Sequence, residues 1–360
     1  MRSKRVGRVA VVLLSAMAGG SLAHLASGKT SASASVAPTP PRPAEPEGTA
    51  EPEPLTPPEP IRDDGHEAEE REGTVPGPSP SPYDPMGTRF AEGRVITGAT
   101  RHRLILLTFD DGPDPRYTPR LLDTLDELGI KAVFFLTARQ IAPDTPWGRR
   151  QAELAREVAR RGHIIGNHTV DHLQLPLLDN ATVREQLAES ERIFERVFGA
   201  RPWLFRPPGG ARSERVDGIV EGRGYTQMMW NLGTGDFQVR TPEEVLETFK
   251  AVFDRRERDN GERGGIVLLH DIHEWSVRAV PLLVRELRRR NCRLLAQGEE
   301  LYDIVDDPAL FFVPRKPKGA HGVAAAPARI DDETLAKRQS RLRHEARRYC
   351  EEGVLVASNR

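Results

Sequence analysis

Short apolar runs alternate with amphipathic stretches through the middle of the chain. The apolar runs predict strands at 104–109, 132–137, 163–167, 203–207, 227–232 and 265–271. Apolar residues recur at helical spacing between them, which predicts helices at 118–128, 147–161, 181–198, 241–258 and 276–290. Regular alternation of strand and helix is typical of a parallel sheet covered on both faces. About 225 residues of it favour an α/β fold built as a distorted (β/α) barrel, with fewer than eight regular units.

The pattern sets the limits of the folded part at about 87–312 and leaves a C-terminal extension at 313–360. Within that extension, residues 331–352 have helical propensity but are charged nearly all round. Such a segment is either a solvated helix or a frayed tail. We therefore expect a charged, partly helical extension.

The first 34 residues have the order of a secretory signal: basic residues, an apolar run at 9–18, and then small residues. Glycines interrupt the longer run to residue 26, so as a membrane span it is short and weakly apolar. We predict a signal peptide or an N-terminal anchor, with cleavage favoured over retention. The protein is then exported and is periplasmic, envelope-associated or extracellular, with a membrane tether if the segment is retained.

Residues 35–86 form a segment rich in proline and glutamate. Of the 30 prolines, 15 lie between Pro38 and Pro85, and the first phenylalanine is Phe90. This composition cannot bury enough apolar surface to offset the entropy of ordering. We predict a disordered linker that holds the following domain away from a membrane or wall.

Composition excludes some partners and some kinds of site. The 52 basic and 53 acidic residues give a net charge of −1, so no overall field attracts nucleic acid, and we expect none as a partner. The two cysteines are too few for a disulfide framework or a cysteine-based zinc site. We expect Cys292 to be buried as a small apolar residue and Cys350 to lie in the charged tail; a bond between them after export is the less favoured alternative.

Unusual polar residues follow two of the predicted strands. Asp110 and Asp111 directly follow the first strand, where two adjacent acids are costly unless a cation compensates them. His168 and His172 stand four residues apart after the third strand. Because active sites of parallel barrels lie at the carboxyl ends of the strands, two imidazoles and one of the acids can hold a divalent metal there, with a position left for water.

Three weaker clusters follow later strands. Arg206, which precedes Pro208 and Gly209, needs a carboxylate partner if it is buried. Asp236 is followed by Phe237, and His270 lies at the carboxyl end of the last predicted strand, where it is a candidate general acid. His273 is the alternative acid, but it lies beyond the predicted strand end.

Taken together, these clusters resemble a known family. In order, they are Thr-Phe-Asp-Asp-Gly-Pro, His-Thr-x-x-His, Arg-Pro-Pro-x-Gly, an Asp followed by an aromatic, and Leu-x-His. They are similar to the five motifs of the polysaccharide deacetylases, carbohydrate esterase family four, over roughly residues 103–302. The resemblance implies a distorted barrel that hydrolyses N-acetyl or O-acetyl groups of sugar polymers with one divalent metal.

The resemblance also implies a role for each matched polar residue. Asp111, His168 and His172 would hold the metal, and Asp110 would be the general base that takes a proton from water. Arg206 would pair with Asp110 and orient it. Asp236 would lie against His270 and raise its pKa, so that the imidazolium can protonate the leaving amine.

Five residues are expected to contact substrate. Leu268 would line the pocket for the acetyl methyl, and the backbone N–H of Gly209, next to Pro208, would hold the oxyanion. Gly209 stands where the family usually has an aromatic, and Phe237 stands where it usually has tryptophan, so one wall of the sugar groove is missing. Trp275 would replace that wall, although a packing role is favoured for it.

The resemblance, together with the predicted export, implies a deacetylase of an acetylated polysaccharide, either peptidoglycan or a chitin-like glycan, with N-acetyl preferred over O-acetyl. Zinc is the expected metal, cobalt and nickel suit the same ligands, and no organic cofactor is indicated. An O-acetyl esterase, an inactive glycan-binding module and a hydrolase of small amides are the alternatives. We expect a monomer.

Overall fold

The computed structural model describes residues 84–90, 95–313 and 330–358. The predicted signal segment lies outside these residues, as does the predicted linker up to residue 83. Within the three described segments, no helix combines the length and apolar character that a membrane span requires.

The strands form one sheet with parallel pairing almost throughout. Their bounds are β1 (Val95–Ile96), β2 (Leu104–Asp110), β3 (Val133–Leu136), β4 (Ile164–Asn167), β5 (Leu204–Phe205), β6 (Thr226–Met228), β7 (Leu232–Gly233), β8 (Gly265–His270), β9 (Asp303–Ile304) and β10 (Phe312–Val313). The order is β10-β1-β6-β5-β4-β3-β2-β8-β7, and β9 pairs with the beginning of β2. Among these ladders, the β1–β10 pair is antiparallel.

The connection between β6 and β7 shows that the sheet curls. The two strands are six positions apart in the sheet order, which in a flat sheet would separate them by about 29 Å. Only residues 229–231 join them, and such a link reaches at most about 14 Å. The sheet must therefore bend into an incomplete barrel, which confirms the distorted parallel barrel expected from the sequence.

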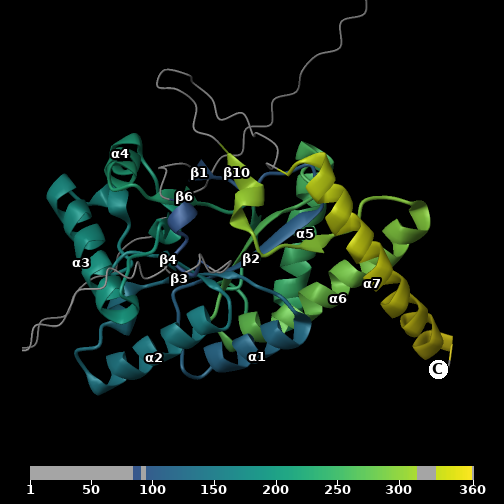
Figure 1. The fold of residues 1–360 in the computed structure, drawn as a ribbon, viewed down its shortest axis with the longest axis horizontal. Helices are drawn as coiled ribbons and strands as arrows, with labels where there is room; N and C mark the ends of the chain where they lie inside the picture. Colours follow the sequence, from purple (N-terminus) through teal and green to yellow (C-terminus); the bar gives the residue numbers. More distant parts are fainter. Residues whose placement is uncertain (1–83, 91–94, 314–329, 359–360) are drawn as a thin grey trace, which may run out of the picture. The chain divides into compact units, whose positions relative to one another are not determined.

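Helices follow most strands and cover the outer face of the sheet (Figure 1). Their bounds are α1 (Thr118–Leu128), α2 (Pro146–Arg160), α3 (Asn180–Phe198), α4 (Glu214–Gly222), α5 (Pro242–Asn260), α6 (Glu274–Gln297) and α7 (Asp332–Ser358). Short 3-10 turns are η1 (Thr88–Phe90), η2 (Ala138–Ile141), η3 (Leu175–Leu177), η4 (Pro208–Gly210) and η5 (Pro308–Phe311). Local chemistry fixes several beginnings: at α5, Thr241 and Glu244 form a capping box.

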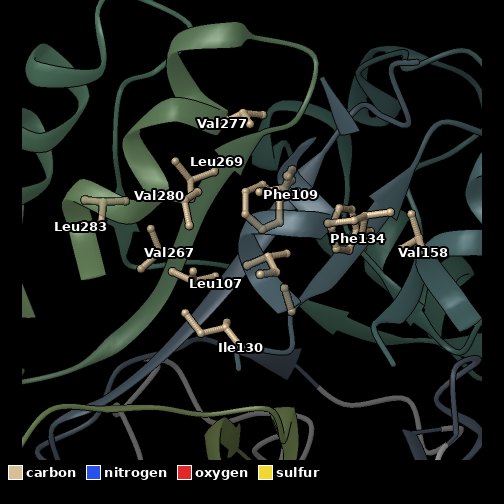
Figure 2. Packing of buried hydrophobic residues seen from close by; sticks show 14 of the residues in the cluster. Leu107, Phe109, Ile130, Phe134, Val158, Val267, Leu269, Val277, Val280 and Leu283 are labelled. Carbon is tan, nitrogen blue, oxygen red and sulfur yellow. The ribbon is translucent and has the colours of Figure 1, made fainter. Parts of the chain in front are cut away.

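The largest core cluster lies between the sheet and its outer helices. Leu107 and Phe109 of β2 point into it beside Val267 and Leu269 of β8, and α6 contributes Val280 among others (Figure 2). Leu104 and Leu106, which alternate with these residues along β2, belong to a second cluster on the other face. Because β2 and β8 are buried on both faces, their carboxyl ends are held rigidly.

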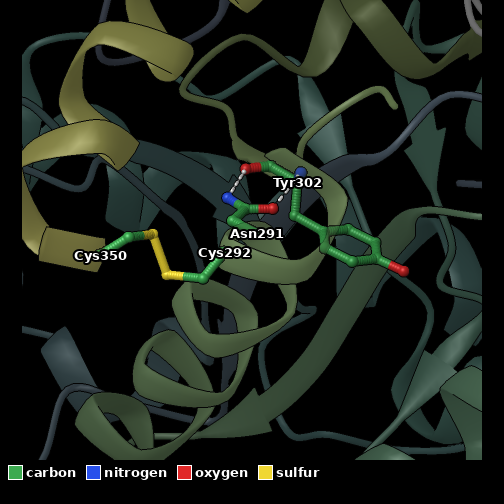
Figure 3. The surroundings of a disulfide bond; sticks show 4 residues. All are labelled: Asn291, Cys292, Tyr302 and Cys350. Atoms are coloured by element: carbon green, nitrogen blue, oxygen red, sulfur yellow. Dashed lines mark hydrogen bonds between the residues drawn. A yellow bond between two sulfur atoms is a disulfide. The ribbon is translucent and has the colours of Figure 1, made fainter. Parts of the chain in front are cut away.

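The C-terminal helix is docked, which differs from the solvated or frayed segment expected. Ala346 of α7 is fully buried, and the side-chain amide of Gln339 exchanges two hydrogen bonds with the backbone of Leu301. A disulfide joins Cys292 of α6 to Cys350 of α7 (Figure 3). The expectation that these cysteines are unpaired is therefore wrong, because packing of α7 along α6 brings their Cα atoms to 5.7 Å, within disulfide range.

Other differences from the expected elements are local. The run at 227–232 is divided into β6 and β7, and α6 continues to Gln297 instead of ending near residue 290. α4 was not predicted, and neither were the two-residue strands β1, β9 and β10. All of these are short elements or element ends, where hydrophobic periodicity is weakest.

Candidate active site

The polar clusters meet at one end of the barrel. Asp110 ends β2, Asn167 ends β4 and His270 ends β8, and the register places Asp110 directly beside His270. Arg206 follows β5 and bonds through its backbone N–H to the carbonyl of Asn167. Segments more than 150 residues apart therefore present their side chains at the same edge, as the parallel arrangement predicts.

Asp111, His168 and His172 form a compact group of ligand atoms. One atom from each lies within 4.8 Å of the others. Oδ1 of Asp111 is 3.5 Å from Nε2 of His168 and 3.2 Å from Nε2 of His172. His168 is buried, whereas the side chain of His172 is 44% exposed, so the group opens to solvent on the His172 side.

The backbone in this region is unusual. Asp111, Thr169 and His172 have φ values of 74°, 70° and 56°, and they are the residues other than glycine with positive φ in the described part of the chain. Two of them are the ligand candidates and the third lies between the histidines. The side-chain oxygen of Asn167 accepts a hydrogen bond from the Thr169 N–H at 2.8 Å, and Thr169 Oγ1 accepts one from the His172 N–H at 3.1 Å.

The imidazole of His168 is oriented by the backbone. Its Nδ1 lies 2.7 Å from the carbonyl oxygen of Arg206, so Nδ1–H donates there and the lone pair of Nε2 points toward Asp111. Burial lowers the pKa of His168, and the nearby charges of Asp110 and Asp111 only partly offset it. A neutral imidazole with a directed Nε2 is the form that binds a metal.

Asp110 is held by a buried arginine. Nη1 of Arg206 donates to Oδ1 of Asp110 at 2.7 Å and to Thr108 Oγ1 at 2.8 Å. Nε of Arg206 donates to the carbonyl of Met228, and its guanidinium lies 4.1 Å from the ring centroid of Phe135. Because Arg206 is fully buried, its charge needs the carboxylate, and the pair fixes the direction of Asp110.

His270 forms the other side of the site. Its Nδ1 lies 2.9 Å from Oδ1 of Asp236, while Oδ2 of Asp236 accepts hydrogen bonds from the His270 N–H and from Ser276. Burial alone would lower the pKa of His270, but the hydrogen bond and charge of Asp236, together with the charges of Asp110 and Asp111, raise it to about 9. Nε2 of His270 is 3.9 Å from Asp111, so it faces the ligand group.

The residues present fit a divalent metal. Oδ1 of Asp111 is buried and accepts no hydrogen bond, which is costly for a carboxylate oxygen unless a cation lies against it. One carboxylate and two imidazoles are a donor set suited to zinc and to related divalent ions. The structure thus brings together the three residues that could hold a metal.

The expected substrate-contact residues differ in exposure. Phe237 is 53% exposed, and its ring centroid is 6.1 Å from that of His270. Leu268 lies two residues before His270 on β8, so both point to the same face of the sheet. Pro208 is buried, whereas Gly209 is exposed, with a φ of 61°, and has only the side chain of Gln174 near its Cβ position.

Trp275 lies beside Asp236 and is half-buried. Its Nε1–H donates to the carbonyl oxygen of Asp236 at 2.6 Å, and its ring stacks on His273 with centroids 4.8 Å apart. The guanidinium of Arg240 covers the ring at 4.8 Å. These contacts favour the packing role for Trp275, because they tie it to the segment that carries Asp236.

Supporting residues were not assigned from the sequence. Thr108 links Arg206 to the carbonyl of Val267, and Ser276 holds Asp236. Asp271 is fully buried beneath Gly112 and accepts a hydrogen bond from Thr118 at 2.5 Å. Only their positions in the sequence could have indicated these residues. Thr108 lies within β2, Asp271 follows β8, and Ser276 lies in the first turn of α6.

A cavity of about 720 Å³ opens beside the ligand group. Asp111 and His172 line it together with the exposed side chain of Trp147, at the start of α2. Arg139 and Asp171, paired at 2.7 Å, form its polar wall. A substrate larger than an acetyl group therefore has room next to the ligand group.

Comparison with known proteins identifies the family. The sequence profile of the polysaccharide deacetylases matches residues 97–228. A peptidoglycan-N-acetylglucosamine deacetylase of Bacillus cereus is 30% identical over 204 residues, which are 55% of this chain and 88% of the relative. A chitin deacetylase of Colletotrichum lindemuthianum is 31% identical over 216 residues, or 59% of this chain and 84% of the relative.

A solved structure is also similar. It is the chitin deacetylase from the fungal pathogen Colletotrichum lindemuthianum, with 27% identity and a TM-score of 0.49 over 63% of this chain and 99% of that one. The profile match covers the segments that carry Asp110, Asp111, His168 and His172, and each of the two relatives is matched over more than four fifths of its own length. The chain therefore belongs to the polysaccharide deacetylase family.

Proposed function

We propose that the protein is a metal-dependent deacetylase that hydrolyses acetyl groups of an N-acetylated amino-sugar polymer, either peptidoglycan or a chitin-like glycan. One observation carries the proposal. The Asp111, His168 and His172 group lies between a carboxylate fixed by arginine and a histidine paired with Asp236. The names of the two relatives support the substrate class, because both are deacetylases of such polymers.

Asp110 serves as the general base. A metal held by Asp111, His168 and His172 would lower the pKa of water and polarise the acetyl carbonyl. Oδ2 of Asp110 lies 3.7 Å from Nε2 of His168, while its Oδ1 is occupied by Arg206. The carboxylate therefore presents one oxygen to the reacting water, and the pair with Arg206 keeps it in that orientation.

His270 serves as the general acid. An amine is a poor leaving group and must be protonated as the C–N bond breaks. Asp236 stabilises the imidazolium through Nδ1, so Nε2 holds the proton that the amine receives. An ester substrate would need this proton less, because its leaving alkoxide is less basic than an amide anion.

Four residues near the ligand group are proposed to contact the substrate. Phe237 would contact the sugar, Leu268 the acetyl methyl, and the backbone N–H of Gly209 beside Pro208 the developing oxyanion. Trp275 would affect substrate binding indirectly, by holding the segment of Asp236 and Phe237 in place. It bonds the carbonyl of Asp236, and Arg240, which lies on its ring, donates to the carbonyl of Phe237. The cavity beside Trp147 would receive a neighbouring sugar.

Zinc is the proposed metal, with cobalt or nickel able to replace it in vitro. The proposed setting is the cell envelope or the extracellular space, and the Cys292–Cys350 disulfide supports export, since disulfides persist in oxidising compartments. A monomer and a tether at the N-terminal apolar segment remain proposals from the sequence.

Acetate release tests the function. The full chain is stripped of metal, assayed with N-acetylated glucosamine oligomers, peptidoglycan fragments and acetylated xylan, and then assayed again with zinc. Zinc-dependent release that Asp110→Asn abolishes is the expected result, with the amide substrates preferred. Faster release from xylan would favour the esterase alternative, and glycan binding without any release would favour an inactive module.

A further inference from the structure

A second cavity lies at the opposite end of the barrel. It has a volume of about 560 Å³ and is bounded by the C-terminal end of α1, by α6, by β9 and by α7. β9 pairs with Leu104 and Ile105, at the beginning of β2, whereas the candidate active site begins at Asp110. Along β2 these ends are about 20 Å apart, so the cavity is separate from the active site.

The walls of this cavity carry a surplus of positive charge. Five cationic side chains line it against three carboxylates, and the cations are Lys131, Arg288, Arg338, Arg341 and Arg348. Asp303 is buried and already bound to Arg338 at 2.5 Å. α6 as a whole has six arginines and two glutamates, although the net charge of the chain is only −1.

Two of these arginines are without a carboxylate partner. Arg288 and Arg348 are exposed, and none of the carboxylates in the described segments lies within 4 Å of either guanidinium. Arg288 lies over the ring of Tyr349 at 5.7 Å. Their N–H groups are free to bind an external anion, and the planar guanidinium suits the paired oxygens of phosphate or carboxylate.

The spacing on α7 indicates an extended ligand. Arg341 and Arg348 are seven residues apart, so they share one face of the helix. Arg338 lies on the same face but is bound to the buried Asp303 and is not counted. At 1.5 Å per residue Arg341 and Arg348 are about 10 Å apart along the helix, which is longer than a single phosphate or carboxylate group. A chain with repeated anionic groups matches this row of charges.

The walls are fixed before any ligand binds. The Cys292–Cys350 disulfide, shown in Figure 3, holds α7 against the body of the domain. The two hydrogen bonds between Gln339 and Leu301 act in the same way. A preformed groove loses little entropy on binding. The exposed large apolar side chains in the described part of the chain are Trp147, Leu173, Leu177 and Phe237, and all lie on segments near the active site. The groove therefore lacks the apolar residues that insert into a lipid surface.

We propose that the groove between α6 and α7 binds a soluble polymer that carries phosphate or carboxylate groups along its chain. This site is distinct from the deacetylation site and would hold the enzyme on an anionic polymer while the other end of the barrel acts on the acetylated glycan. A neutral oligosaccharide is not a ligand for it.

The test measures binding to the metal-free full chain, so that no metal can hold the probe. The probes are polyphosphate, oligogalacturonate and vesicles of phosphatidylglycerol, each at two salt concentrations. The groove variant is Arg288→Gln/Arg348→Gln. The matched control, Arg285→Gln/Arg347→Gln, removes the same charge from exposed arginines on the same helices but outside the cavity.

The groove variant is expected to weaken binding of polyphosphate or oligogalacturonate at least about tenfold, and the control less than about twofold. The better of the two probes identifies the anionic group. Circular dichroism checks folding, and Arg288→Lys/Arg348→Lys, which keeps the charge but not the paired donors, should bind with intermediate affinity. The proposal would be overturned if the wild type bound neither polymer, or if the groove variant and the control lost the same affinity. Stronger binding to the vesicles than to both polymers would also overturn it.

Discussion

At the residue scale, the active site depends on backbone conformations that L-residues seldom adopt. The positive φ values at Asp111, Thr169 and His172 cost roughly 1–3 kcal/mol each. Asn167 compensates part of this cost, because its amide also donates to Ser190 and to the hydroxyl of Tyr225, both at 2.8 Å. The fold therefore holds the ligand candidates in strained positions through bonds to α3 and to the residue before β6, neither of which carries a reacting group.

Gly112 provides the sharpest test of this arrangement. A Cβ at Gly112 would overlap the carboxyl group of Asp271, which is fully buried. Gly112→Ala must displace either Asp271 or the neighbouring Asp111. We expect a loss of about 1–3 kcal/mol in unfolding free energy and zinc binding at least about tenfold weaker, measured by urea unfolding and by competition with a chelator.

A helical glycine is the control for Gly112→Ala. Nothing lies within 4 Å of a Cβ at Gly218 in α4, so Gly218→Ala should leave zinc affinity unchanged and raise stability by about 0.5–1 kcal/mol. Adding Asp271→Ala to Gly112→Ala removes the overlapping group and should restore part of the zinc affinity. Unchanged zinc affinity in Gly112→Ala alone would show that Asp111 does not depend on this contact.

The sequence indicated the candidate residues that the structure brings together better than it indicated the residues that support them. The His168–His172 spacing and the paired acids stand out locally, and the resemblance supplied the roles of Arg206, Asp236 and His270. The roles of Thr108, Asn167 and Asp271 were not predictable, because their hydrogen bonds join segments whose separation in space only the fold defines. The bond between Arg206 and Thr108, for example, spans 98 residues.

At the element scale, ion pairs join the outer helices. Glu286 of α6 accepts hydrogen bonds from Arg289 and from Arg290, and Arg290 also reaches Asp254 of α5 at 2.6 Å. Burial would raise the pKa of Glu286, but the bonds and charges of the two arginines lower it to about 2. The Glu286 carboxylate thus helps to hold Arg290 in the position from which it bonds Asp254 of α5.

The pKa of Glu286 predicts a pH-dependent contribution to stability. Because the folded-state pKa is below its usual value near 4.5, the contribution is present above about pH 4.5 and is lost as pH falls toward 2. Glu286→Gln should therefore reduce the unfolding free energy by about 1 kcal/mol at pH 7, and the difference from wild type should shrink in acid. Urea unfolding across this pH range measures it.

Glu247 of α5 is the control for Glu286→Gln. It pairs with Lys250 at 2.8 Å but is largely exposed, so Glu247→Gln should change stability little at any pH. A difference between wild type and Glu286→Gln that stays constant down to pH 2 would mean that the carboxylate charge is not the cause.

Long, strongly patterned elements were predictable, and short ones were not. α1 has the predicted bounds, and β2, β3, β4 and β8 fall on the predicted runs to within a residue or two. α4 has nine residues with two glycines, which dilute the helical pattern. The run at 227–232 contains β6 and β7 because Asn231 turns inward to bond the backbone of Gly264 and Ile266, which interrupts the strand.

At the scale of the whole molecule, the two ends of the barrel carry different chemistry. The carboxyl ends of the strands hold the candidate metal ligands, the proposed base and the proposed acid, whereas the other end holds a cationic groove built by α6 and α7. The charge pattern of residues 331–352 did not predict this docking, because only a few positions such as Ala346 face the domain. The groove exists only while α7 stays in place.

The disulfide allows the attachment of α7 to be tested. Cys292 and Cys350 are 58 residues apart, and closing a loop of this length in the unfolded chain is worth about 4 kcal/mol in the chain-entropy model. Cys292→Ser/Cys350→Ser should therefore lose about 2–4 kcal/mol in urea unfolding, and reduction of the wild type should produce the same loss. Zinc-dependent acetate release at 25 °C should not change, because the active site lies at the other end of the barrel. Binding of polyanions should weaken, since α7 then loses its covalent attachment to α6. Equal stability of the variant and the oxidised wild type would instead show that noncovalent packing of α7 is sufficient to hold the groove.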